Sequence, residues 1–243
     1  MGELKLGKHR LRTPAVCGAV MGQSPEEMER VAARAVKQGA DLIELRFDSL
    51  RKSRGWEKLL QKNLPIIFTN RPKREGGGFS GTEAKRVALI LDAISLGADC
   101  VDIELSTPKK LRDRVISEAR RSGAAVIMSQ HDFSKTPLVE ELAAYAKDLQ
   151  RTGCDVAKVV TLANDATDAF RVLDFLVRVQ DEVDVPVISF AMGEAGRITR
   201  ILAAFLGSPI TYASAGKPTA PGQLDVAQTK LLLRQFARAR GKR

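Results

Sequence analysis

The chain has 243 residues, of which 44% are hydrophobic and 28% are charged, and its formal net charge is +10. This length fits one large domain or two small ones, and the composition is typical of a globular protein rather than a disordered one. No apolar run reaches the roughly 18 residues that a membrane span needs, and no apolar stretch with a cleavage site follows the basic N-terminus, which argues against a secretory signal.

The cysteines and histidines limit the chemistry that the chain can carry out. The three cysteines are odd in number and far apart, each in or beside an apolar run: Cys17, Cys100 and Cys154. We therefore expect buried free thiols in a reducing cytoplasm. Because there is no CxxC spacing and there are only two histidines, we expect no metal site.

The positive charge leaves two kinds of ligand open. A basic protein can bind nucleic acid, or it can attract an anionic small molecule. Aromatic residues make up only 5% of the chain, which is few for stacking platforms that hold bases. We therefore favour an anionic substrate and expect no nucleic-acid partner.

Short apolar runs alternate with longer amphipathic stretches along the whole chain. Most of these runs are rich in Val, Ile or Leu, as strands buried on both faces are. The predicted strands are 15–20, 42–47, 65–69, 100–105, 124–129, 155–162, 187–191 and 210–213. About eight strand–helix units in this length predict a single (β/α)₈ barrel over residues 1–243, and the alternative is a doubly wound open sheet.

Helix boundaries support the alternation. Ser24-Pro25 predicts a helix start with Glu27 completing a capping box, and Thr107-Pro108 and Thr136-Pro137 predict similar starts. A glycine follows four of the amphipathic stretches just before the next strand, where it can close the helix in the left-handed conformation. These four glycines are Gly39, Gly97, Gly123 and Gly153.

Two predicted strands carry charges on the face that should line the barrel. In the second strand, alternation directs the apolar side chains toward the helices and turns Glu44, Arg46 and Asp48 inward. In the fourth strand, Asp102 and Glu104 share the inner face. Because buried charges are costly unless paired, these residues indicate either a polar pocket or an ion-pair network that fixes the barrel.

Further polar residues lie where strands three and five end. Arg71 closes the third strand, and the glycine-rich segment 75–79 follows it without the Gly-Lys-Ser/Thr of a P-loop. His131 follows the fifth strand. A flexible loop and a structural histidine are the alternatives, but the carboxyl ends of barrel strands are where active sites lie.

Lys158 lies among valines in the sixth predicted strand. A lysine is rarely buried. Desolvation favours its neutral amine, which can attack a carbonyl. The alternative is a lysine whose head reaches the barrel mouth and pairs with a carboxylate.

The loops after the last two predicted strands contain a candidate anion-binding residue and a candidate lid over the site. After the seventh strand, Gly193 precedes a helix, and Arg200 could contact a carboxylate or be a solvated helix charge. After the eighth strand, the segment 216–223 could be a lid or simply a turn.

As an ordered set, these motifs resemble type I 3-dehydroquinate dehydratase of the shikimate pathway. The similar segments are Glu44-Leu45-Arg46-Phe47-Asp48, Thr69-Asn70-Arg71 with Glu75-Gly76-Gly77, His131-Asp132-Phe133, the strand with Lys158, Met192-Gly193 through Arg200, and Ala220-Pro221-Gly222-Gln223. They run in family order over nearly the whole chain.

The resemblance implies syn elimination of water from 3-dehydroquinate through an imine on Lys158. It implies that His131 transfers protons, that Glu75 supports His131, and that Arg200 holds the substrate carboxylate. The other implied binding residues are Glu44, Arg46, Arg71, Thr219 and Gln223. It further implies no metal or organic cofactor, a cytoplasmic location and a homodimer.

One departure from the family pattern stands in the lid, where Thr219 replaces the common serine. The hydroxyl is kept, so binding should survive. The chain carries no appended shikimate dehydrogenase domain, so we expect a monofunctional enzyme. Two other functions stay open from the residues: a class I aldolase with a phosphate site near the last two strands, and a basic barrel that binds nucleic acid or acts as a scaffold.

Overall fold

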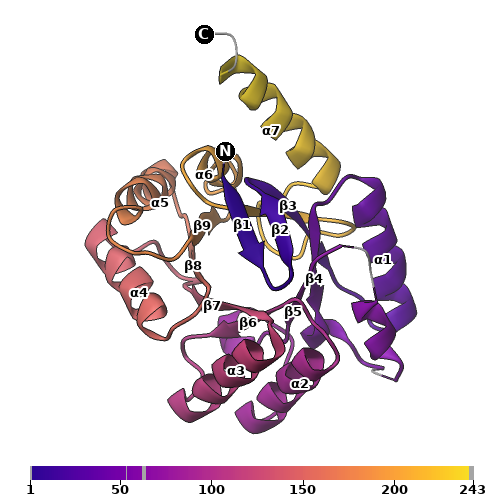
Figure 1. Cartoon of the computed structure of the whole chain (residues 1–243). Helices are drawn as coiled ribbons and strands as arrows, with labels where there is room; N and C mark the ends of the chain where they lie inside the picture. The colour runs from indigo at the N-terminus through magenta and orange to yellow at the C-terminus, as the bar shows by residue number, and fades with distance from the viewer. Residues whose placement is uncertain (1, 53, 62–63, 241–243) are drawn as a thin grey trace.

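The computed structural model describes residues 2–52, 54–61 and 64–240, and a ring of eight parallel strands surrounded by helices is its central feature (Figure 1). The strands are β3 (Ala15–Val20), β4 (Leu42–Arg46), β5 (Ile66–Thr69), β6 (Cys100–Glu104), β7 (Ala125–His131), β8 (Val156–Leu162), β9 (Val187–Met192) and β10 (Ile210–Ser214). Their hydrogen-bonded order, β10-β3-β4-β5-β6-β7-β8-β9, follows the chain apart from the return of β10 beside β3. The prediction of a (β/α)₈ barrel is confirmed, and the open doubly wound sheet is wrong.

Helices follow nearly every strand and form the outer layer (Figure 1). They are α1 (Pro25–Lys37), α2 (Glu83–Ser95), α3 (Lys109–Ser122), α4 (Val139–Arg151), α5 (Ala166–Val179), α6 (Thr199–Phe205) and α7 (Val226–Arg240). Between β4 and β5 the described residues instead form two 3₁₀ helices, η1 (Phe47–Ser49) and η2 (Trp56–Leu60). Gly55 has φ 81° directly before η2, a conformation that interrupts a helix. None of the described helices combines the length and apolarity that a membrane crossing requires.

The predicted helix boundaries are right at some ends and wrong at others. Ser24 Oγ accepts the N–H of Glu27 at the start of α1, as predicted, although the Glu27 carboxylate accepts from Gln23 N rather than from the cap residue. The four glycines at helix ends all have positive φ, between 75° and 93°, which confirms their role as terminators.

Thr107 and Thr136 do not cap helices, contrary to the prediction. The cap positions of α3 and α4 are Pro108 and Leu138, and neither makes a side-chain cap bond. Both threonines are buried, and their hydroxyls are used inside the protein. The Thr107 hydroxyl accepts from Arg86, and the Thr136 hydroxyl donates to the carbonyl of Leu162.

Alternation along the strands divides the apolar core into two parts. Outward side chains such as Ile43 and Leu45 pack against the helices, as predicted. Inward side chains near the strand starts form a second cluster with Leu4, Leu6 and Leu11. These leucines belong to an antiparallel hairpin of β1 (Glu3–Leu6) and β2 (His9–Arg12), which lies across the barrel in Figure 1. The hairpin therefore closes the amino-terminal end of the barrel and leaves the carboxyl-terminal end for a site.

Substituting Leu6 tests how much the hairpin contributes to stability. Leu6 is fully buried against the barrel interior. Leu6→Ala is therefore expected to lower the free energy of unfolding by roughly 2–5 kcal/mol, measured by urea denaturation. Lys5→Ala, the exposed neighbour on the same strand, is the matched control and should change it by less than about 0.5 kcal/mol. Equal effects of the two substitutions would contradict the hairpin's role as a plug.

The three cysteines are free and buried, as predicted. Burial raises the pKa of the Cys17 and Cys100 thiols well above the usual value, and that of Cys154 to about 11. All three are therefore protonated and unreactive at neutral pH.

Candidate active site

A cavity of about 170 Å³ lies among the carboxyl-terminal ends of the strands and the loops that follow them. All nine residues predicted for the site contribute to its lining: Glu44, Arg46, Arg71, Glu75, His131, Lys158, Arg200, Thr219 and Gln223. A larger cavity of about 500 Å³ lies beside α6 and α7, but none of these nine residues lines it. The smaller cavity is therefore the candidate active site.

Lys158 lies on the inner face of β8 and is only 4% exposed. Its Nζ atom donates to Asp102 Oδ2 at 3.0 Å and lies 4.2 Å from the centre of the Tyr212 ring. Burial opposes ionisation of Asp102, but the charges of Arg71 and Lys158 outweigh it and hold the pKa of that carboxyl far below its usual range. Lys158 is thus a buried amine at the cavity that pairs with a carboxylate, as the alternative interpretation expected, and its role as a nucleophile stays a prediction.

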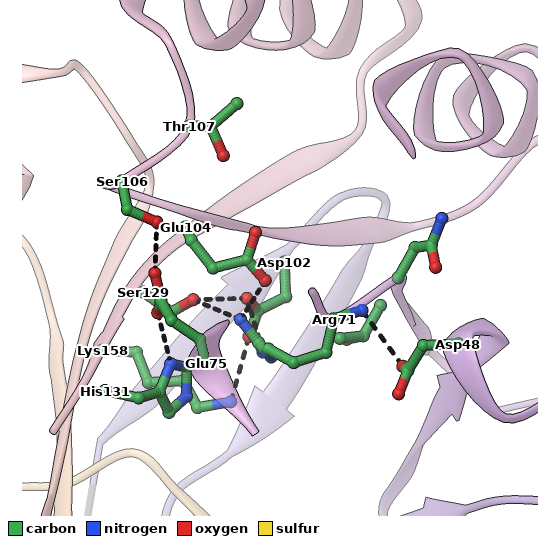
Figure 2. A network of polar contacts seen from close by, with 12 residues as sticks. Asp48, Arg71, Glu75, Asp102, Glu104, Ser106, Thr107, Ser129, His131 and Lys158 are labelled. Carbon is green, nitrogen blue, oxygen red and sulfur yellow. Dashed lines mark hydrogen bonds and ion pairs between the residues drawn. The ribbon is translucent and has the colours of Figure 1, made fainter. Parts of the chain in front are cut away.

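His131 ends β7 and is held by Glu75 from the loop after β5. The His131 Nδ1 atom lies 2.9 Å from Glu75 Oε2, and Ser106 donates to the other carboxylate oxygen (Figure 2). Burial, together with the charges of Arg71 and Lys158, lowers the pKa of His131 well below its usual value. The imidazole is therefore neutral, and an Nδ1–H donated to Glu75 leaves the Nε2 lone pair available as a base.

At the cavity wall, Arg71 is the centre of a buried polar network (Figure 2). Its guanidinium donates to Glu104 at 2.5 Å and to Ser129 at 2.7 Å, and it lies 2.8 Å from Asp102. The inward orientation of Asp102 and Glu104 is confirmed. Glu104 does not line the cavity, so for this residue the interpretation as an ion pair that fixes the barrel is the correct one.

Arg86 is a part of this network that sequence reasoning missed. It is fully buried on α2, and one of its nitrogens lies 2.6 Å from Glu104 Oε2. The same guanidinium donates to the carbonyl of Asn70, just before Arg71. The signal was present, because position 86 belongs to the apolar stripe of α2 with Val87 and Ile90, where an arginine is out of place.

Glu44 and Arg46 both face the cavity from β4. Glu44 is 4% exposed and accepts from the Thr69 hydroxyl at 2.8 Å. Arg46 makes two parallel bonds of 2.9 Å to Asp48. Among the described residues the other terminal nitrogen of this guanidinium has no hydrogen-bond partner, so it can take another acceptor.

Asp48 does not continue the inward row, contrary to the prediction. The chain leaves the strand after Arg46, and Asp48 lies in η1. Its carboxylate accepts the backbone N–H groups of Arg71 and Gly78 at 3.0 and 2.9 Å. Burial opposes its ionisation, but the Arg46 charge and these bonds lower its pKa. Asp48 thus fastens the loop that carries Glu75.

Arg200 is a buried cation without an acidic partner in the described part of the chain. It is 2% exposed, its Nε atom has no hydrogen-bond partner there, and one terminal nitrogen donates to the carbonyl of Pro221 at 3.2 Å. Burial lowers its pKa to about 10. The interpretation of Arg200 as a solvated helix charge is wrong, because its guanidinium faces the cavity beside Phe190. Such a cation is suited to an anionic group of a ligand.

The segment 216–223 lines the cavity with four residues, Thr219, Ala220, Pro221 and Gln223, and its role as a lid stays a prediction. Gln223 Oε1 accepts the backbone N–H of Thr219 at 2.7 Å and its hydroxyl at 3.0 Å. Gly222 has φ 72° and packs so closely that an added Cβ would lie 2.3 Å from the carbonyl oxygen of Gly193. This glycine therefore permits the contact between the lid and the loop after β9.

The apolar wall of the cavity was not predicted. It is made by Phe133, Val160, Phe190, Met192 and Tyr212. Tyr212 could have been found from the period of its strand, because it lies two residues from Ile210 on the same inner face.

Comparison with known proteins identifies the family. The family model described as Type I 3-dehydroquinase matches residues 16–239. The chain belongs to the type I 3-dehydroquinase family. A 3-dehydroquinate dehydratase from Methanothermobacter thermautotrophicus is 39% identical over 90% of this chain and 95% of its own length. One from Methanococcoides burtonii is 36% identical over 93% of this chain and 97% of its own.

Solved structures agree with this family. The crystal structure of 3-dehydroquinate dehydratase from Geobacillus kaustophilus has a TM-score of 0.90 at 28% identity, over 98% of this chain and 97% of that one. The resemblance to type I 3-dehydroquinase and the prediction of a hydro-lyase are confirmed. The class I aldolase and the non-catalytic barrel are therefore wrong as descriptions of this chain.

Proposed function

We propose that this type I 3-dehydroquinase dehydrates 3-dehydroquinate to 3-dehydroshikimate by syn elimination, through a Schiff base on Lys158, in aromatic amino-acid biosynthesis. The observation that carries the proposal is the content of one cavity: a buried lysine, a neutral histidine held by a carboxylate, and a buried arginine that has no acidic partner among the described residues. A cyclic keto acid with a hydroxyl β to its ketone matches these three groups.

The first step is imine formation. The Lys158 amine attacks the substrate ketone, and the ketone oxygen leaves as water while a C=N bond forms. The attack uses the unprotonated amine, and His131 is a neutral base on the neighbouring strand β7. The two are placed together because Ser129 pairs with Lys158 in the β7–β8 register, which puts His131 one inward position further along the neighbouring strand. Asp102 then remains as the counter-ion of the positive imine.

The elimination follows from the charge on the imine. The positive nitrogen withdraws electrons, so the neighbouring C–H bond becomes acidic and His131 Nε2 can remove its proton. The resulting enamine expels the β-hydroxyl, which leaves as water with a proton from His131. Water then hydrolyses the imine, which releases the conjugated ketone and regenerates Lys158. The net change is the loss of one water from the substrate.

The remaining lining residues are proposed to hold the substrate. Arg200 would bind the carboxylate, since it is buried and its Nε has no hydrogen-bond partner in the part of the chain that the structure describes. Glu44, Arg46, Arg71 and Gln223 would bind hydroxyl oxygens, and Thr219 would supply the lid hydroxyl. Three of the five N–H donors of Arg71 face Glu104, Ser129 and Asp102, so we expect its charge to contribute more than new hydrogen bonds.

Two measurements on the wild-type protein test the proposal. Incubation with 3-dehydroquinate should produce the absorbance of a conjugated ketone. Borohydride added during turnover should reduce the imine and leave a covalent mass on the peptide that contains Lys158. Absence of product at high enzyme concentration would count against the reaction, and a label on another lysine would count against the nucleophile.

Substituting Arg200 tests the carboxylate contact. Arg200→Gln is expected to raise KM about 100-fold or more, because a buried charge-assisted pair with the substrate is lost. Arg197→Gln is the matched control, since Arg197 is half exposed in the turn just before α6 and pairs with Glu194. An unchanged KM in Arg200→Gln, measured by initial rates, would remove Arg200 from the binding site.

Three further expectations concern the whole protein. We propose that the enzyme acts as a homodimer in the cytoplasm and has no nucleic-acid partner. Sedimentation of the purified chain tests the first point. A nucleic-acid titration at low salt tests the last, since non-specific binding should be strongest there.

A further inference from the structure

The Glu75 carboxylate has two oxygens, and each one contacts a different side chain. Oε2 faces His131 Nδ1 at 2.9 Å, and Oε1 accepts a hydrogen bond from the Ser106 hydroxyl (Figure 2). Glu75 is 7% exposed, whereas Ser106 lies on the solvent-exposed loop after β6. A contact from the protein surface therefore reaches the carboxylate behind the catalytic histidine.

Arg74 fixes the direction of the Ser106 proton. The Arg74 Nε atom donates to Ser106 Oγ at 3.1 Å, and a terminal nitrogen of the same guanidinium lies 2.9 Å from Glu83. A hydroxyl has one proton, and an oxygen that accepts from Arg74 directs that proton to its other neighbour. The chain of contacts thus runs from Arg74 through Ser106 and Glu75 to His131, each donor facing an acceptor.

We propose that Ser106, oriented by Arg74, is a positioning residue for the proton transfers of His131, because it holds Glu75 as an oriented carboxylate. The proposal rests on the proposed function, since it concerns the base that removes the substrate proton. With Glu75 ionised and fixed, its Oε2 accepts Nδ1–H and keeps the Nε2 lone pair toward the cavity. Without Ser106, Glu75 loses the contact that orients one of its oxygens.

The charges around Glu75 determine the direction of the expected pH effect. Arg71 from the end of β5 favours its ionised form, whereas burial and the carboxylates of Asp102 and Glu104 from β6 oppose it. His131 faces it from β7, and Arg74 lies beside it on η3 (Lys73–Glu75). Burial raises the pKa of Glu75, and the Ser106 hydrogen bond counteracts that rise. Removing the hydroxyl therefore raises the pKa further, so protonation inactivates the Glu75–His131 pair at a higher pH.

The test compares Ser106→Ala with Ser106→Thr, which keeps a hydroxyl. Ser106→Ala is expected to lower kcat roughly ten-fold with little change in KM. This loss is smaller than the whole contribution of a positioned general base, because His131 and Glu75 are both still present. The acid limb of its kcat–pH profile should move to higher pH, while borohydride trapping at Lys158 persists. Ser106→Thr should restore both kcat and the profile. Ser95→Ala is the control, because Ser95 lies at the exposed end of α2 and its hydroxyl donates only to the carbonyl of Asp92.

Two outcomes would overturn the role of Ser106. One is a Ser106→Ala profile and kcat equal to those of the wild type. The other is an equal loss of turnover and trapping that threonine does not rescue, because it would mean that Ser106 only supports the loop.

Failure of the proposed function is distinguishable from failure of the Ser106 proposal. If the proposed function is wrong, the wild-type protein itself forms no product and no borohydride-trapped adduct. The positioning role can then still be measured in the free protein from the ¹⁵N shifts of His131. Its Nδ1–H tautomer should dominate in the wild type and lose population in Ser106→Ala.

Discussion

Replacing Lys158 by alanine is expected to lower kcat for the dehydration at least about 10⁴-fold, because the substrate then has no amine with which to form an imine. Without the imine, the proton next to the ketone is removed only by a neutral-carbonyl route. Initial rates followed by absorbance give the size of the loss, and mass measurement after borohydride should find no adduct. The change should leave the barrel folded, because Arg71 still lies 2.8 Å from Asp102 and keeps that carboxylate paired.

Lys109→Ala is the matched control for this experiment. Lys109 is exposed at the start of α3 and forms a surface pair with Asp113. Such a pair contributes little to stability, and the residue lies away from the cavity lining. Its removal should leave both turnover and trapping at Lys158 intact. Turnover by Lys158→Ala above about a hundredth of the wild-type rate would contradict an obligatory imine on this residue.

The barrel and the charged side chains on its inner face were predicted from the sequence because two periods were clear. Runs of Val, Ile and Leu between capped amphipathic stretches indicated buried parallel strands. Within β4 and β6, alternation alone placed Glu44, Arg46, Asp102 and Glu104 inward. The prediction from alternation was wrong at Asp48. Side chains alternate between the two faces only while the strand continues, and the chain enters η1 directly after Arg46.

The parts that were missed depend on contacts between distant segments. The sequence around Thr107 does not show that its hydroxyl accepts a hydrogen bond from Arg86 instead of capping α3. That choice depends on which groups are buried together in the folded protein. The hairpin is a different case. Leu4, Leu6 and Leu11 alternate with charged residues around Gly7, which is a hairpin pattern, but only packing across the barrel end makes so short a pair stable.

The family resemblance supplied roles that physical reasoning from the residues did not. The residues by themselves indicated a carbonyl substrate with an anionic group. The structure adds a physical reason for each part of that description. Lys158 is buried beside its counter-ion, and Arg200 is buried with an Nε that has no partner among the described residues.

Replacing His131 by alanine should separate imine formation from elimination. The neutral imidazole, oriented by Glu75, is the proposed base and acid for the elimination, so its loss is expected to lower kcat roughly 10²- to 10⁴-fold. Imine formation also uses proton transfers, but water that enters the vacated space can carry these. The variant should therefore accumulate an adduct on Lys158 that borohydride traps in high yield while product appears slowly.

His9→Ala is the matched control, because His9 lies at the opposite end of the barrel in β2, with its Nε2 atom 3.1 Å from Asp99. It should keep wild-type turnover. In the wild type, the lowered pKa of His131 predicts that kcat persists below pH 6.5, until the Glu75–His131 pair takes up a proton. His131→Ala should lose this acid limb of the kcat–pH profile. If borohydride trapping at Lys158 falls as far as turnover does in His131→Ala, then His131 is needed before the imine exists. The proton transfers that form the imine would then depend on this histidine as strictly as the elimination does.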